Sequence, residues 1–146
     1  MSYAIRVGVA DDFADVRAFL DDHLRRDYFI PSRQLREILD GRYHETLLAI
    51  ENERLLGVAI MTKRLRTLVN LLVSPCERKR GIGDALLSRL RVERVRAKLN
   101  VSDGDPSGYY RKRGYRDSPE RTGKQHIKIM VVDLDDPPDW TQFATN

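Results

Sequence analysis

The residues best suited to chemistry lie in one basic loop that contains two glycines. Three consecutive cations, Arg78, Lys79 and Arg80, precede Gly81 and Gly83. If such a loop opens a helix, the free amides of the first turn and the positive end of the helix dipole favour an anion. Glycines permit unusual backbone angles and a close approach to bare backbone, and the cations add charge-assisted hydrogen bonds. A pyrophosphate would be the natural ligand of such a loop.

Two familiar phosphate motifs do not account for this loop. The P-loop pattern G-x-x-x-x-G-K-S/T is absent, and the dinucleotide fingerprint needs a glycine where this chain has Leu86. Taken alone, the G-x-G pattern fits a tight strand-to-helix turn at Gly81 equally well. The loop by itself leaves both interpretations open.

A second, aromatic segment favours the phosphate interpretation. The run Val73-x-Pro75-x-x-Arg78-x-x-Gly81-Ile82-Gly83-x-x-Leu86-Leu87 resembles the acyl-CoA-binding motif of the GNAT superfamily, R/Q-x-x-G-x-G/A. The run Tyr109-Tyr110-Arg111-Lys112-Arg113-Gly114-Tyr115 resembles the F-Y-x-x-x-G-F/Y element of the same family. With the strands around them, the two motifs cover residues 44–132. Together they are much more specific than either alone.

The resemblance implies a binding site for acetyl-CoA as co-substrate. In the family, the end of the fourth strand binds the pantetheine arm through its backbone, a role that falls on Leu71, Leu72 and Val73. Loop amides then hold the pyrophosphate. This second role falls on Arg78, Lys79, Arg80, Gly81, Ile82 and Gly83, with Asp84 next in line.

Tyr110 occupies the position of the family's general acid. A tyrosine with an ordinary pKa of ~10 is protonated at neutral pH and can donate a proton to a leaving thiolate. The structural alternative for Tyr110 is a packed helix aromatic, although its neighbour Tyr109 suits that role better. Asp103 lies where many relatives place a cofactor-contacting asparagine, and a turn or helix cap is the alternative for it.

The general base is not evident from the sequence. Some relatives use a glutamate on the fourth strand, but no acid occurs from Leu55 to Cys76. The candidates elsewhere are His44, Glu45, Glu51, Asp103 and Asp105, and a water relay is an equal alternative.

The single cysteine, Cys76, allows no internal disulfide and favours a cytoplasmic setting. The histidines show no metal-ligand spacing, so no metal site is predicted.

Charge is unevenly distributed along the chain. Residues 64–132 carry 17 Lys or Arg and 7 Asp or Glu, whereas residues 1–63 carry 9 and 11. The later region therefore offers a positive field to an anionic partner, either a nucleic acid or a phosphorylated small ligand. A nucleic-acid-binding module would use Arg89, Arg91, Arg94 and Arg96, which this interpretation places on the helix after the loop. It is not favoured, because interleaved aromatics and groove-reading motifs are missing.

The hydrophobic pattern predicts a single three-layer α/β domain. No apolar run approaches the ~20 residues that span a bilayer, so no membrane association is expected. Strands are expected over Ala4–Val9, Thr46–Glu51, Leu55–Thr62, Arg66–Val73, Ala97–Val101 and Ile127–Val132, with a short partner at Tyr115–Arg116. Helices are expected after Asp12, over Ser32–Leu39, from Gly83 to Glu93 and over Pro106–Arg113.

The resemblance refines these expectations. It implies a GNAT fold with a mixed, mostly antiparallel sheet of six or seven strands, about four flanking helices and a splay between the fourth and fifth strands. The domain would span residues 1–134, followed by a tail at 135–146. The implied activity is N-acetyl transfer from acetyl-CoA to an amine. A degenerate acyl-CoA-binding protein is the rival hypothesis, and the acceptor and a homodimer stay open.

Overall fold

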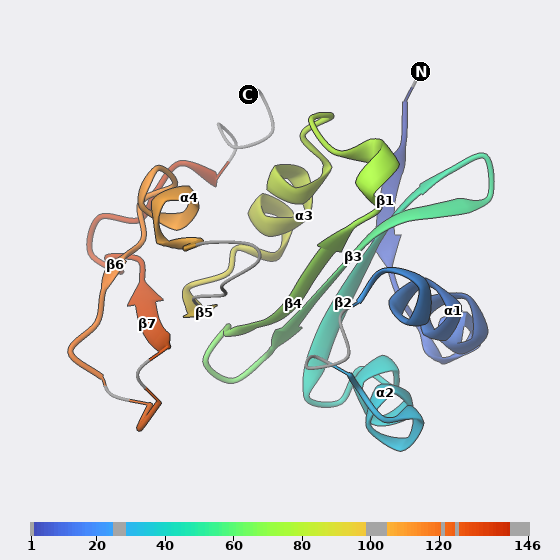
Figure 1. The fold of residues 1–146 in the computed structure, drawn as a ribbon, viewed down its shortest axis with the longest axis horizontal. Coiled ribbons are helices and arrows are strands. Elements are labelled where there is room, and N and C mark those ends of the chain that lie inside the picture. Colours follow the sequence, from blue (N-terminus) through green and yellow to red (C-terminus); the bar gives the residue numbers. More distant parts are fainter. Residues whose placement is uncertain (1, 25–28, 99–104, 121, 125, 141–146) are drawn as a thin grey trace.

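The computed structural model describes residues 2–24, 29–98, 105–120, 122–124 and 126–140. These residues form seven strands and four α-helices (Figure 1). The strands are β1 (Ala4–Val7), β2 (His44–Glu51), β3 (Arg54–Thr62), β4 (Leu68–Val73), β5 (Arg94–Lys98), β6 (Arg116–Asp117) and β7 (Ile127–Val131). The helices are α1 (Phe13–His23), α2 (Ser32–Leu39), α3 (Ile82–Leu90) and α4 (Ser107–Arg111).

The strands belong to two sheets. One is antiparallel in the order β1-β2-β3-β4, and the other is antiparallel in the order β5-β7-β6. Among the described residues, one parallel bridge, between Thr67 and Arg94, joins them. The expected fold class, including the splay between the fourth and fifth strands, is therefore confirmed.

The first sheet is covered on both faces (Figure 1). Helices α1 and α2 pack on one face around fully buried Val16, Leu35 and Ile38, while α3 covers the other face. Four residues of α3 face the sheet and are each at most 1% exposed: Ile82, Leu86, Leu87 and Leu90. Because both faces are covered, β3 has a continuous buried run instead of an alternating one.

Several expected boundaries are wrong by two or three residues. Strand β5 begins at Arg94, three residues before its expected start, and β1 ends at Val7. Helix α3 ends at Leu90 because Arg91 adopts a left-handed conformation (φ 52°). Arg94 and Arg96 therefore lie on a strand and not on the helix after the loop. Periodicity did not find this boundary, because the α3–β5 connection, Arg91–Glu93, carries no glycine or proline to mark it.

The end of the chain also contacts the core. Within the described residues, Trp140 packs against the hydrophobic cluster between α3 and the sheet. Pro138 lies over Gly114. The described part of the segment predicted as a tail, 135–140, thus contributes side chains that contact the fold. Over the part of the chain that the structure covers, no helix has the length and apolar character needed to cross a membrane.

Gly57 allows α3 to lie close to β3. A Cβ atom at this position would lie 3.1 Å from Ile82 Cγ2, 3.2 Å from Leu86 Cδ1 and 3.3 Å from the Leu72 carbonyl oxygen. We expect Gly57→Ala to lower the free energy of unfolding by about 1–3 kcal/mol, because α3 would be displaced from the sheet. Urea denaturation would measure the change.

Gly108→Ala is the matched control. Nothing lies within 4 Å of the Cβ atom that it would add, and the residue is inside helix α4. This change should be neutral or stabilising by up to about 1 kcal/mol. Equal effects of the two substitutions would contradict the close packing inferred at Gly57.

Candidate active site

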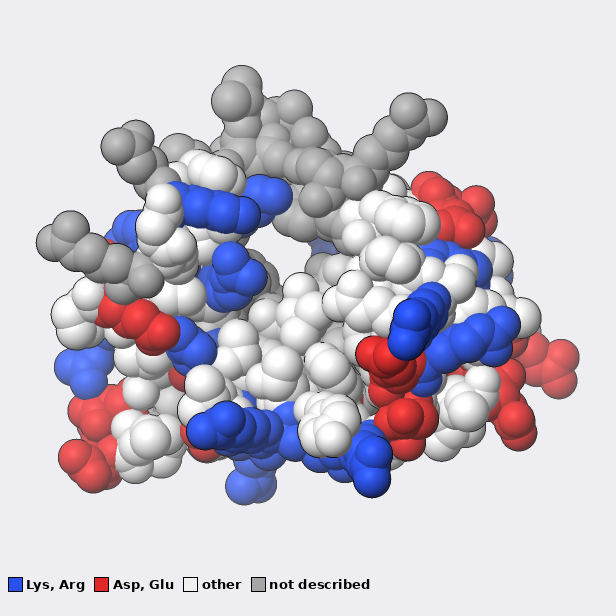
Figure 2. All heavy atoms as spheres, turned by 90° about the horizontal axis from the view of Figure 1, so that it is seen from below, with Lys and Arg blue, Asp and Glu red and all other residues white. Residues whose placement is uncertain are grey.

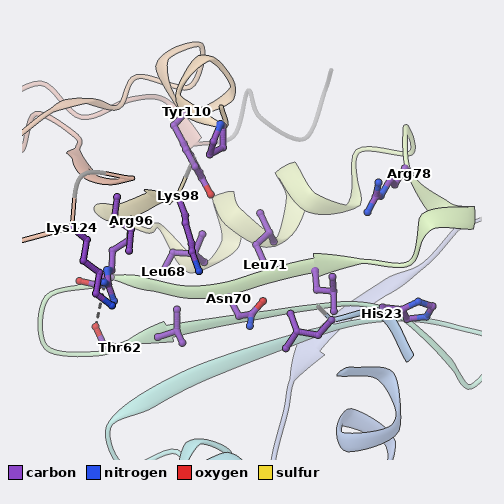
Figure 3. Close-up of a pocket in the computed structure, with 16 residues that line it drawn as sticks. His23, Thr62, Leu68, Asn70, Leu71, Arg78, Arg96, Lys98, Tyr110 and Lys124 are labelled. Atoms are coloured by element: carbon purple, nitrogen blue, oxygen red, sulfur yellow. Dashed lines mark hydrogen bonds between the residues drawn. The ribbon is translucent and has the colours of Figure 1, made fainter. Parts of the chain in front are cut away.

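The site begins where β4 and β5 separate. The strands meet at the Thr67–Arg94 bridge, where Glu93 N–H and Arg94 N–H donate to Arg66 O at 3.0 and 3.2 Å. Beyond this point they share no described ladder, and a pocket of about 910 Å³ is lined by both strands (Figure 3). The molecule is hollowed near its middle, with Lys and Arg side chains along one side of the hollow (Figure 2). The separation of two strands therefore creates the cavity.

The edge of β4 that faces this pocket has free backbone groups. Ser74 N–H donates to Leu56 O of β3 at 2.8 Å. Alternation along an antiparallel strand then directs the backbone of Leu72 toward β3 and the backbones of Leu71 and Val73 toward the open edge. Ile60 pairs with Asn70 and Met61 with Leu68, so Val69 has no partner on β3. This β-bulge bends the strand beside the pocket. Of the three predicted pantetheine residues, Leu71 and Val73 direct their backbones to the open edge. Leu72 directs its backbone to β3 and packs its side chain against the α1–α2 cluster.

The glycine-containing loop forms a second pocket that adjoins the first. A volume of about 430 Å³ is lined by the end of β4, by most of the loop and the start of α3, and by Tyr109 and Arg113. Of the predicted loop residues, Arg80 is not among those that line it. Gly81 has φ 76°, and Ala85 N–H donates to Gly81 O at 2.9 Å as the first bond of α3. The amides of Ile82, Gly83 and Asp84 therefore have no partner within the helix. Only Gly81 of the two glycines has positive φ.

The three cations of the loop have different environments. Arg80 donates to Glu51 at 2.8 Å and to Glu77 at 2.7 Å, and Arg54 also bonds Glu77. These contacts tie the loop to the β2–β3 turn and hold the pKa of Glu51 below its usual range, chiefly through the hydrogen bond from Arg80. Arg78 and Lys79 line the second pocket, and neither forms an ion pair with a described residue. Their charges remain available to an anion.

Asp84 is neutralised by a partner that the sequence analysis did not single out. Its carboxylate, in a residue only 8% exposed, accepts hydrogen bonds from Arg113 Nε at 2.7 Å and Nη2 at 2.8 Å. Tyr109 donates its hydroxyl to the same carboxylate at 2.6 Å. Burial, and secondly this bond, raise the pKa of Tyr109. The sequence did hold a signal for such a partner. An acid beside a predicted phosphate site would repel the phosphate unless a cation neutralised it.

Tyr110 has the opposite environment to Tyr109. Its hydroxyl points into the larger pocket (Figure 3), and it forms no hydrogen bond with a described residue. The ring packs edge-to-face against Tyr109 and Tyr115, with centroids 5.2 and 5.7 Å away. Burial raises the pKa of Tyr110 to about 12. The side chain is thus a fixed, protonated donor aimed at the cavity.

None of the described acids lines the larger pocket. Glu51 is paired with Arg80, and the carboxylate of Asp105 accepts hydrogen bonds from the amide and hydroxyl of Ser107. His44 lies outside the pocket, and burial lowers its pKa. Asp103 lies outside the described residues. Three cationic side chains that line the pocket, Arg96, Lys98 and Lys124, were not predicted as site residues.

A metal has no evident place in the described part of the chain, where no cluster of three or more His, Cys, Asp or Glu side chains could hold one. Cys76 is exposed. The groups available at the two pockets are therefore an open strand edge, a helix start with free amides, the Tyr110 donor, the His23 imidazole and several cations.

Comparisons with known proteins identify this arrangement. The family model for the acetyltransferase (GNAT) domain matches residues 11–133. The fold is similar to Arabidopsis thaliana NAA60 in complex with a bisubstrate analogue, at 15% identity and a TM-score of 0.68, covering 90% of this chain and 97% of that one. No curated protein matches the sequence significantly.

Two microbial structures are similar to the same extent. The ribosomal-protein-S18-alanine N-acetyltransferase from Escherichia coli has 16% identity and a TM-score of 0.68, over 89% of this chain and 92% of that one. The PaiA N-acetyltransferase from Thermoplasma acidophilum in complex with coenzyme A has 15% identity and a TM-score of 0.66, over 92% and 100%. At these identities the likeness establishes the fold.

The ion pair between Asp84 and Arg113 should contribute to stability. Arg113→Met would leave a nearly buried carboxylate without its cation, so we expect a loss of about 2–3 kcal/mol in the free energy of unfolding. Arg111→Met breaks a pair with Asp117 in which both side chains are about half exposed, and it should cost less than about 0.5 kcal/mol. Urea denaturation of both variants tests this, and similar losses would refute the structural role of Arg113.

Proposed function

We propose that this chain, which belongs to the GNAT acetyltransferase family, transfers an acetyl group from acetyl-CoA directly to an amine, with Tyr110 as the general acid. The observation that carries the proposal is the Tyr110 hydroxyl. It is protonated, held by two neighbouring rings and directed into the pocket that opens between β4 and β5. An acid at this place suits a reaction that releases a thiolate.

The loop pocket fits the diphosphate of coenzyme A. The free amides of Ile82, Gly83 and Asp84 open helix α3, and a Cβ atom added at Gly81 would meet nothing within 4 Å. Arg78 and Lys79 would add charge, whereas Arg80 would act through its backbone because Glu51 and Glu77 hold its side chain. Asp84 does not oppose the phosphates, since Arg113 neutralises it.

The open edge of β4 fits the pantetheine arm. Its amide groups could bond to Leu71 and Val73 as an added strand would. This places the arm in the continuous space shared by the two pockets, both of which are lined by Leu71, Leu72 and Arg78. The thioester supplies the acetyl group when acetyl-CoA is bound.

The protein's own contribution to proton transfer has two parts. Tyr110 O–H gives its proton to the sulfur as the carbon–sulfur bond breaks. The acceptor must arrive as a neutral amine, and the pocket has no described carboxylate to deprotonate it. Nearby cations lower the pKa of an ammonium group, so Arg96, Lys98 and Lys124 favour the neutral amine and a water can carry its proton away.

Thiol release from acetyl-CoA with a panel of amines tests the proposal. Tyr110→Phe should lower kcat about 10²–10³-fold, because only the proton donor is lost. Affinity for coenzyme A, measured by calorimetry, should change less than about twofold. Tyr43→Phe, at a side chain that is two-thirds exposed, is the control. Unchanged turnover in Tyr110→Phe would remove the residue from the mechanism, and cofactor binding without any turnover would favour the non-catalytic acyl-CoA-binding alternative.

The raised pKa of Tyr110 predicts the shape of the pH profile. A phenol with a pKa of about 12 stays protonated to higher pH than an ordinary tyrosine, so the acid is not lost below pH 10. We expect kcat/KM to rise with pH as the amine loses its proton, with no decline that depends on Tyr110 up to about pH 10. A decline with a midpoint near 9 that is absent in Tyr110→Phe would contradict this assignment.

A further inference from the structure

The larger pocket has a cationic wall, defined here as Arg96 and Lys124 at the end far from the loop and Lys98 nearer the middle. Strand β5 alternates strictly, with Val95 and Ala97 buried in the core and Arg94, Arg96 and Lys98 on the other face. That face borders the pocket, and Lys124 joins it from the segment before β7. The alternation therefore places a row of positive charge along the cavity.

Two cations of the wall, Arg96 and Lys124, are not explained by ion pairs with described residues. Arg94, on the same face of β5, is paired with Glu120, and Lys128 on β7 is paired with Asp117. Arg96 and Lys124 form no ion pair with a described residue. Two cations that line one pocket repel each other, and no described carboxylate of the pocket offsets this repulsion. A bound anion would offset it. The arrangement thus suits a negatively charged ligand.

The wall is also separated from the proposed phosphate cradle. In Figure 3, Arg78 lies at one end of the pocket and Arg96 and Lys124 at the other, with Tyr110 and Lys98 between them. The loop pocket includes Arg78 but none of the wall residues. A diphosphate bound at the loop would leave the wall unused, so the wall faces the acceptor.

We propose that the acceptor is a small amine that also carries an anionic group, a carboxylate or a phosphate, which Arg96 and Lys124 bind while the amine faces Tyr110. This inference rests on the proposed acetyl transfer. Arginine suits both anions because its guanidinium bonds two oxygens at once. A volume of about 910 Å³ is within the range of small-molecule sites, ~300–1,000 Å³, and must also hold the thioester arm. The occupant is therefore small.

The reaction then balances without a protein base. The amine nitrogen bonds to the acetyl carbon, the carbon–sulfur bond breaks, and the sulfur takes the Tyr110 proton. The proton released by the amine passes to water and restores the phenol. Neutralising the anionic group of the acceptor removes the charge that would hold a proton on its amine. One wall thus binds the acceptor and favours its reactive form.

Matched amines test the inference. The probes are ethanolamine with O-phosphoethanolamine, and phenethylamine with phenylalanine, titrated by calorimetry into protein saturated with coenzyme A and assayed for thiol release with acetyl-CoA. At least one anionic member should bind about tenfold more tightly than its neutral parent. The Arg96→Gln/Lys124→Gln double variant should lose this preference, with affinity for coenzyme A changed less than about twofold. Which pair shows the preference distinguishes phosphate from carboxylate.

Lys128→Gln is the control, because it removes one charge from the adjoining strand outside the pocket. It should keep the preference. Equal binding of both members of each pair, a preference that survives in the double variant, or a parallel loss of coenzyme A affinity would each overturn the inference. Salt-sensitive RNA binding without any preference among the amines would overturn it in favour of a nucleic acid. A retained anion preference without thiol release from any amine would instead refute only the proposed acetyl transfer.

Discussion

The structure depends on one parallel bridge, between Thr67 and Arg94. At this point β4 and β5 are held together through the Arg66 carbonyl, and beyond it each strand keeps a partner on one side only. Backbone groups left unpaired at a strand edge need water or a ligand. The separation therefore creates both a cavity and a surface that can bond an extended molecule. If the two strands paired along their whole length, neither the pocket nor the open backbone of Leu71 and Val73 would exist.

Packing around this separation holds the chemical groups in place. Gly57 lets α3 approach β3 closely, so that the start of the helix lies beside the end of β4. The Asp84–Arg113 pair and Tyr109 then connect the same helix start to α4. Because Tyr109 is fixed on this cluster, the adjacent Tyr110 is turned into the pocket. A phosphate cradle and a proton donor from distant parts of the sequence are thereby held by one set of contacts.

Charge pairing determines what each cation can do. Arg80 and Arg113 have acidic partners and act as structural connections, although both lie in motifs that suggest anion binding. Arg78, Arg96 and Lys124 have none in the part of the chain described, and all three line the pocket. The many Lys and Arg residues of 64–132 thus fall into two groups. Some form internal ion pairs, and others give the pocket a positive charge. The net charge alone indicated an anionic partner. The positions of the cations that have no acidic partner indicate where it would bind.

The sequence alone was sufficient for the family and most of the architecture, because both depend on local patterns. Glycine and cations between an apolar run and an amphipathic run identify the loop, and three- and four-residue spacing identifies Ser32–Leu39 and the buried face of α3. It did not reveal the start of β5, since no turn residue marks the end of the helix. Nor did it reveal the partner of Asp84 or the wall around Arg96. Those depend on residues 29 positions apart in the chain, or on which strand face borders a cavity, and only the packing of the two sheets decides them.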